Sequence, residues 1–410
     1  MPAEPIPAST GDSLYLSILD DMIGARVFTS TVYFYRSANS KINNKPVAEV
    51  LRDTLAKVLV PYYPFSGSLG ETKKGKLEVF FGPDQGTLLI EAHSEATIDG
   101  LGSLTIPNPA WARLIYRFPI GEAYKVVDMP SVIAQITSFS CADGIGAMQF
   151  IGAWAATARS GVLVTNPKPC WDREFFKPRK PPLVKFPRVE FMKIDDGSTL
   201  TSTLWKTKPV QECCRINHEF QTQLKQLALP DDGQGCTSFD ALAAHVRRSW
   251  VKALNVNPLE YELRLTSSVN ARQKFLDPPL KDGFYGNVVT CCSQLSSTAR
   301  LVREARKNVT EDYVREEYVR QGRILRKSTC GGLWIILRWT DLKRLEFGGK
   351  FWMGRPVYAG PIDLTPTPQV CVILPDGEAA APSHKISIVV CIFLSEAAAS
   401  KFRERLLEFP

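Results

Sequence analysis

The residues best suited to acid–base chemistry are few. The chain has four histidines, which are His93, His218, His245 and His384. A positioned imidazole can take the proton of an attacking alcohol, which typically accelerates a reaction ~10²–10⁴-fold. None of the four is followed by an aspartate four residues later, and the residue four positions before Asp143 is Phe139. A histidine–aspartate pair at this spacing is therefore absent from the sequence.

Other candidate chemical groups have ordinary structural explanations. His245 lies on a helix-like segment, Ala243–Val246, which favours a packed structural histidine. Cys141 has no neighbouring histidine or basic residue to lower its pKa, so we do not expect a thiol nucleophile. The pairs Cys213–Cys214 and Cys291–Cys292 lack C-x₂-C spacing, and we expect no metal site. The hydrolase elbow, H-E-x-x-H, P-loop and G-x-G-x-x-G patterns are absent from the sequence.

The elements around Asp143 follow from local patterns. Val132–Ser140 predicts a strand that runs directly into Asp143-Gly144-Ile145-Gly146, and Ala147–Arg159 predicts a helix ended by Gly161. Asp143 followed by glycine and an apolar helix is also typical of a helix N-cap. A cap and a role in a functional motif are compatible, and both interpretations remain open.

Further elements predict a two-domain α/β protein. Thr87–Ala92 predicts a strand, Thr237-Ser238 a cap before the helix Ala241–Leu254, and Thr298–Arg320 one long charged helix. Between Asn166 and Pro187 there are six prolines, typical of an extended crossover. We therefore expect an N-terminal domain at 1–165, a crossover at 166–235 and a C-terminal domain at 236–410.

Composition narrows the class of protein. A chain of 410 residues fits two domains of about 200 residues each. Its formal net charge of +8 suits either an anionic ligand or a solvated surface, and no long basic run indicates nucleic acid. No apolar run reaches the ~20 residues that span a bilayer, and no secretory signal is visible. We expect a cytoplasmic protein whose ten cysteines stay reduced.

Seven local patterns occur in one order along the chain. They are Leu16–Asp20, Tyr62–Gly67, Asp143–Gly146, Pro169–Arg173, Asn270–Arg272, Tyr285–Asn287 and Gly354–Pro361. Each is weak alone, but together they closely resemble the plant BAHD acyltransferases over nearly the whole chain. Within that family, Asp20–Tyr35 and Ala142–Trp154 most resemble hydroxycinnamoyl transferases that act on ω-hydroxy fatty acids and fatty alcohols.

The resemblance implies a fold and a mechanism. It implies two chloramphenicol-acetyltransferase-like domains with mixed sheets, joined by the Pro-rich crossover, with a channel between them. Acyl-CoA is a co-substrate rather than a bound cofactor, and the other substrate is a small or long-chain alcohol. A histidine four residues before the motif aspartate deprotonates the acceptor, which then attacks the thioester. We expect a monomer that binds no nucleic acid.

The resemblance also implies roles for individual residues. Asp143 is the motif aspartate, with a structural role, and Gly144, Trp352 and Gly354 belong to structural motifs. The residues implied on the CoA side are Ser238, Arg272 and Asn287. Ser238 and Asn287 could instead be simple cap or turn residues. Arg272 could instead be an ordinary surface arginine. We also expect Arg272 to pair with Asp143.

The chain departs from the family pattern at two motifs. In relatives, a strand resembling Ile136–Cys141 is followed by a glycine turn and a second strand that carries the histidine. Here Cys141 joins Ala142 directly, and Lys350–Gly354 stands where the family has Asp-Phe-Gly-Trp-Gly. Either the sheet closes over the gap, or the sequence is a splice variant, an inaccurate gene model or a decaying copy. The functional alternatives are an acyltransferase and a non-catalytic relative that binds acyl ligands or assists fatty-acid elongation.

Overall fold

A computed structural model describes the chain in two compact units. The described residues are 1–6, 11–17, 19–21, 31–36, 41–42, 45–73, 75–82, 86–116, 142–177, 180–181, 185–186, 208–228, 236–255, 264–294, 299–316, 333–338, 351, 356–362, 370–376 and 387–409. Unit 1 comprises Met1–Lys177, Pro278–Val288 and Leu342–Leu364. Unit 2 comprises Pro178–Asp277, Val289–Asp341 and Thr365–Pro410. Each unit is described by itself.

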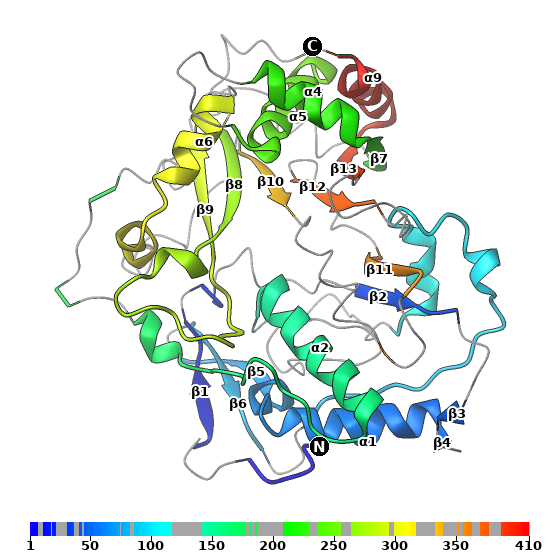
Figure 1. Ribbon diagram of the computed structural model, residues 1–410, viewed down its shortest axis with the longest axis vertical. Coiled ribbons are helices and arrows are strands. Elements are labelled where there is room, and N and C mark those ends of the chain that lie inside the picture. The colour runs from blue at the N-terminus through cyan, green and yellow to red at the C-terminus, as the bar shows by residue number, and fades with distance from the viewer. Residues whose placement is uncertain are drawn as a thin grey trace. The chain divides into compact units, whose positions relative to one another are not determined.

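In the part that the structure describes, unit 1 combines small antiparallel sheets with two long helices. One sheet has the order β1 (Ser13–Tyr15), β6 (Leu77–Phe80), β5 (Ser68–Glu71). Two further pairs are β2 (Thr31–Phe34) with β11 (Tyr358–Pro361) and β3 (Lys41–Ile42) with β4 (Lys45–Pro46). The helices are α1 (Val47–Leu59) and α2 (Gly144–Ser160), which are labelled in Figure 1. Short 3-10 turns are η3 (Tyr63–Ser66), η4 (Ile98–Leu101), η5 (Pro109–Leu114) and η6 (Arg173–Phe176).

The helix α2 is the centre of the unit 1 core. Apolar residues recur along it and pack with α1 around Phe150, Ile151 and Trp154. The indole N–H of Trp154 donates to the hydroxyl of Thr54 on α1 at 3.2 Å, so the large ring is buried with its polar atom satisfied. The helix ends at Gly161, whose φ of 74° is the left-handed conformation that favours glycine. The predicted end of this helix is confirmed.

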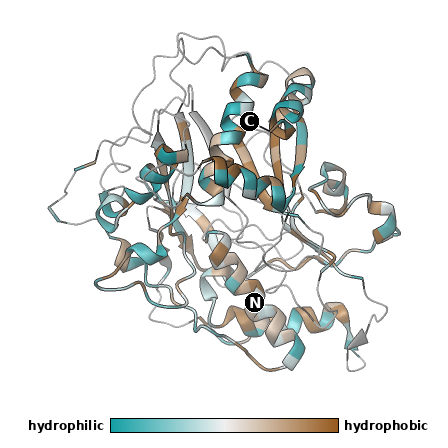
Figure 2. Ribbon diagram, turned by 45° about the horizontal axis from the view of Figure 1, so that its top comes forward, coloured by the Kyte–Doolittle hydropathy of each residue, from teal (hydrophilic) through white to brown (hydrophobic). Residues whose placement is uncertain are grey.

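Unit 2 is built on one mixed sheet of six strands. The order is β7 (Val210–Ile216), β13 (Ile388–Leu394), β12 (Val370–Pro375), β10 (Leu333–Arg338), β8 (Arg264–Asn270), β9 (Val289–Gln294). β10 runs parallel to both β8 and β12, whereas the other neighbours are antiparallel. The strands β12 and β13 are almost entirely apolar, and the brown stretches of Figure 2 include them. Such continuous apolar runs are typical of strands that are covered on both faces.

Among the described residues, the helices of this unit include α4 (His218–Leu227), α5 (Ser238–Ala253), α6 (Ala299–Lys307) and α9 (Glu396–Leu407). The apolar faces of α5 and α9 pack on one face of the sheet around Leu242, Val246 and Phe402. α5 begins with a capping box, in which Thr237 and Asp240 bond each other's backbone N–H. The short turn η8 (Arg272–Lys274) follows β8.

The fold class predicted from the sequence is confirmed, and two element predictions are wrong. Thr87–Ala92 is not a strand, because only Leu88 within it forms a β-bridge. The long helix predicted at Thr298–Arg320 ends at Lys307, and residues 311–316 start a new helical segment. The three-part division at 165 and 235 stays a prediction. Val132–Ser140 lies outside the described residues.

Candidate active site

Asp143 occupies the N-terminus of α2 and holds a second chain segment there. Its Oδ1 accepts hydrogen bonds from the backbone N–H groups of Ile145 and Gly146 at 3.1 and 3.0 Å. Its Oδ2 accepts from the backbone N–H of Val288 at 3.0 Å. The cap interpretation of Asp143 is therefore confirmed. The carboxylate also ties α2 to Tyr285–Val288, which we call the central segment.

Gly146 is required by the closeness of the central segment. A Cβ at position 146 would lie 1.9 Å from the carbonyl oxygen of Tyr285 and 2.7 Å from its carbonyl carbon. No side chain can be accommodated at such distances unless the backbone moves. The second glycine of the Asp143–Gly146 pattern thus allows α2 and the central segment to touch. Gly144 is the exposed first residue of α2, and its structural role stays a prediction.

A buried ion pair holds the other side of the central segment. The Oδ2 of Asp20 accepts from Arg173 Nε at 3.1 Å and from the Ser17 hydroxyl at 2.7 Å. Its Oδ1 accepts from the backbone N–H of Asn287 at 2.9 Å. The side chains of Asp20 and Arg173 are 0% and 2% exposed. A buried charge pair of this kind requires satisfied hydrogen bonds, because each ion has lost its water.

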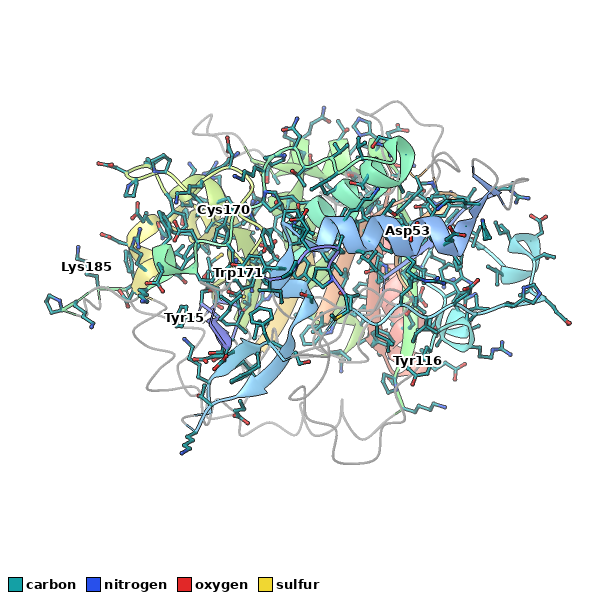
Figure 3. All side chains as sticks on the ribbon, turned by 90° about the horizontal axis from the view of Figure 1, so that it is seen from below. Tyr15, Asp53, Tyr116, Cys170, Trp171 and Lys185 are labelled. Carbon is teal, nitrogen blue, oxygen red and sulfur yellow. The ribbon has the colours of Figure 1, made fainter. Side chains whose placement is uncertain are left out.

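Aromatic rings and a glycine surround the guanidinium of Arg173. Its Cζ lies 3.3 Å from the ring centroid of Trp171, a residue labelled in Figure 3. A Cβ at position 286 would lie 2.4 Å from the same Cζ, so Gly286 leaves the space that the guanidinium fills. Cation–π contact and the carboxylate together stabilise the buried charge.

The ring of Tyr285 joins this arrangement to the rest of the core. Its centroid lies 4.8 Å from Tyr62, 5.4 Å from Phe65 and 5.3 Å from Trp171. Five of the seven sequence patterns therefore meet at the central segment: those of Asp20, of Tyr62 and Phe65, of Asp143, of Arg173 and of Tyr285. The meeting point is a packing and hydrogen-bonding centre within unit 1. Asp20, Arg173 and Gly286 belong to the sequence patterns, but the sequence alone assigns them no role, because a buried ion pair is recognised only when both partners are located in space.

The sequence of unit 1 offers one histidine as a candidate general base. Unit 1 contains a single histidine, His93, and it is exposed. Burial raises the pKa of the Tyr62 hydroxyl, which keeps it protonated. Three backbone N–H groups donate to the carboxylate of Asp143 and hold it in place as a hydrogen-bond acceptor.

The remaining predicted residues lie in several places. Ser238 is the exposed first residue of α5. The backbone N–H of Arg272 donates to Asn270 Oδ1 at 3.1 Å, and its pairing with Asp143 stays a prediction. Asn287 is buried, and its side-chain amide donates to the carbonyl of Leu19 at 2.6 Å. The implied CoA contacts of these three residues stay predictions. Phe139, Trp352 and Gly354 lie outside the described residues.

His245 is a structural histidine, as predicted. It is buried on α5, and its Nε2 lies 2.8 Å from the carbonyl oxygen of Leu406. Burial lowers the pKa of its imidazole. Within the described parts of the chain, no cluster of three metal-ligating side chains is found. No described helix is long and apolar enough to cross a membrane.

Comparison with known proteins identifies the family. A family model described as the Transferase family matches residues 1–408. The chain belongs to this family, the BAHD acyltransferases. The fold agrees, because vinorine synthase matches with a TM-score of 0.70 at 17% identity, over 100% of this chain and 96% of that one.

Several BAHD relatives are similar in sequence. Omega-hydroxypalmitate O-feruloyl transferase of Arabidopsis thaliana is 31% identical over 427 residues, which cover 96% of this chain and 88% of the relative. Fatty alcohol:caffeoyl-CoA acyltransferase of the same organism is 31% identical, with coverages of 88% and 87%. Piperamide synthase of Piper nigrum is 32% identical, with coverages of 88% and 82%. The recognition of the BAHD family from seven short patterns is confirmed.

Proposed function

We propose that this BAHD protein is an acyl-CoA-dependent O-acyltransferase of low turnover. It transfers a hydroxycinnamoyl group to an ω-hydroxy fatty acid or a fatty alcohol, giving an ester and free CoA. The observation that carries the proposal is the similarity, over most of the chain, to two relatives named for a feruloyl or caffeoyl group and a long-chain acceptor. Acyl-CoA is a co-substrate, and the chain acts as a cytoplasmic monomer.

The low turnover follows from the residue at position 139. An alcohol is a weak nucleophile until a base takes its proton in the transition state. The side chain of Phe139 has no proton acceptor, and the single histidine in the sequence of unit 1 is His93, which is exposed. Asp143 accepts backbone hydrogen bonds on both of its oxygens, which tie it to the start of α2 and to the central segment. We expect turnover at least ~10²-fold below that of a relative with the motif histidine.

Release of free CoA thiol measures this directly. The purified chain is mixed with feruloyl-CoA and an ω-hydroxy fatty acid, beside a BAHD relative that carries the histidine. A reaction without the acceptor corrects for hydrolysis of the thioester. Slow, acceptor-dependent release supports the proposal. Release as fast as that of the relative would show that the chain does not need a base at position 139.

Phe139 also favours a second function, that of a non-catalytic protein which binds acyl ligands or assists fatty-acid elongation. Equilibrium dialysis with feruloyl-CoA separates the two. Binding without any acceptor-dependent thiol release supports the non-catalytic function. Failure to bind feruloyl-CoA contradicts both functions and indicates a defective product, such as a splice form or an inaccurate gene model.

A further inference from the structure

Two cysteines face each other across neighbouring strands of unit 2. Cys213 on the edge strand β7 is directly opposite Cys391 on β13, and the two Sγ atoms are 3.2 Å apart. Direct cross-strand neighbours have Cβ atoms about 4.5–5.5 Å apart, while a disulfide needs about 3.5–4.5 Å. A small movement of the two strands is therefore enough to bridge these sulfur atoms.

The two thiols differ in environment. Cys213 is partly exposed, and Gln211 Nε2 donates to its Sγ at 3.3 Å, whereas Cys391 is buried. The hydrogen bond between Cys213 and Cys391, the one that Gln211 donates and the charge of Arg403 lower the pKa of Cys213, against the opposing effects of burial and Glu212. The pKa of Cys391 is raised well above its ordinary value by the same hydrogen bond and by burial. Cys213, the partly exposed member of the pair, is thus the thiol that an oxidant reaches first, with Cys391 beside it as the thiol that resolves its oxidised form.

Two nearby cysteines provide an internal contrast. Cys214 follows Cys213 on β7 but packs in the core formed with α5 and α9, as does Cys371 on β12. Burial raises the pKa of Cys214 to about 12 and also raises that of Cys371. These two thiols are therefore kept protonated and away from solvent, although they lie close to the pair in the sheet.

We propose that Cys213 and Cys391 form a redox-active pair that closes to a disulfide when hydrogen peroxide oxidises the protein. The Cys213 thiolate attacks the peroxide oxygen, the O–O bond breaks, and after protonation water and a sulfenic acid on Cys213 result. The Cys391 sulfur then attacks the Cys213 sulfur, its proton joins the departing hydroxyl, and a second water leaves. Each hydrogen peroxide is reduced to two waters and two thiols become one disulfide; a dithiol reductant reverses the change.

The disulfide should raise the stability of the sheet in unit 2. It joins the edge strand β7 to β13 between positions that are 178 residues apart in the chain. Crosslinks that close long loops restrict the unfolded chain most. We expect the oxidised protein to melt several degrees above the reduced protein. The proposal is independent of acyl transfer, since it concerns only side chains of unit 2.

Thiol labelling with peptide mass mapping tests the pair in the full-length chain. In the reduced protein we expect iodoacetamide to label Cys213 roughly tenfold faster than Cys214 or Cys371. After one equivalent of hydrogen peroxide, the expected product has a crosslink between the peptides of Cys213 and Cys391, removed by dithiothreitol. Labelling of Cys213 no faster than of Cys214, or crosslinks that leave out Cys391, would overturn the proposal.

Variants assign the two roles. Cys391→Ser should hold Cys213 as a sulfenic acid that reacts with dimedone, and Cys213→Ser should prevent oxidation of Cys391. Cys214→Ser is the matched control, since it changes the next residue of the same strand and should leave the crosslink intact. Loss of the crosslink in a folded Cys214→Ser protein contradicts the assignment. The labelling rates of the unchanged protein decide the matter if a variant does not fold.

Discussion

The buried pair of Asp20 and Arg173 should be a large contributor to the stability of unit 1. The carboxylate of Asp20 accepts from Arg173, from the hydroxyl and backbone N–H of Ser17, and from the backbone N–H of Asn287. In Asp20→Asn the shape is kept, but one oxygen becomes an N–H₂ group that faces donors. Removing one partner of a buried pair costs about 3–5 kcal/mol, and a buried N–H left without an acceptor costs about 1–3 kcal/mol. Because these effects overlap, we expect the free energy of unfolding to fall by about 4 kcal/mol or more.

Urea unfolding followed by tryptophan fluorescence measures this loss. Asp172, the residue before Arg173, provides the control. It pairs with Lys281 in an exposed ion pair at 2.7 Å. Asp172→Asn should leave the unfolding midpoint unchanged within error, since exposed ion pairs contribute little. A loss below about 1 kcal/mol for Asp20→Asn would refute the assignment of a stabilising centre, because a surface pair would give that value.

Two further predictions concern Asp143 and His245. Asp143→Asn keeps an acceptor for the cap of α2 but turns an N–H₂ group toward the Val288 N–H. Asp143→Ala removes the acceptors of both the Gly146 and Val288 N–H groups, and should lower the free energy of unfolding by about 1–3 kcal/mol, more than Asp143→Asn does. Equal unfolding midpoints for the two variants would contradict the cap. The pKa of His245 is lowered from 6.5 by burial, so its contribution to stability is full above that pH and is lost as the pH falls, because the unfolded chain takes up the proton first. In His245→Gln, whose amide can still donate to Leu406, the urea midpoint should fall less between about pH 7 and pH 5 than in the unchanged protein. An equal fall in both proteins would show that other groups cause this pH dependence.

Local elements could be predicted from the sequence where a short-range signal fixes them. Gly161 ends α2 and Thr237 caps α5 as expected, because caps depend on residues within one turn. Thr87–Ala92 has strand-like residue types but pairs with no neighbouring strand beyond one bridge at Leu88. β propensity depends on such partners, and a local window does not contain them.

Long-range pairing could not be predicted in this way. β11 is a short strand near the end of the chain, and it pairs with β2 more than 300 residues earlier. The β7 strand was not predicted, because its Gln211–Arg215 stretch mixes polar residues with two cysteines. Its place in the sheet is set by the apolar strand β13 beside it. The same holds for the site: Asp20 and Arg173 are 153 residues apart and become a pair only in the folded unit.

Family membership and turnover depend on different residues of this chain. A general base lowers the barrier of a reaction and contributes little to folding, whereas Asp20, Arg173, Gly146 and Gly286 are needed for the packing of the central segment. Loss of a histidine-bearing segment between Cys141 and Ala142 would therefore remove the chemistry and leave the residues that identify the family in place. Reading the transcript across that junction separates a processing difference from a substitution. A histidine-bearing segment found there would supply the base and the missing strand together, without changing any of the residues that hold the central segment.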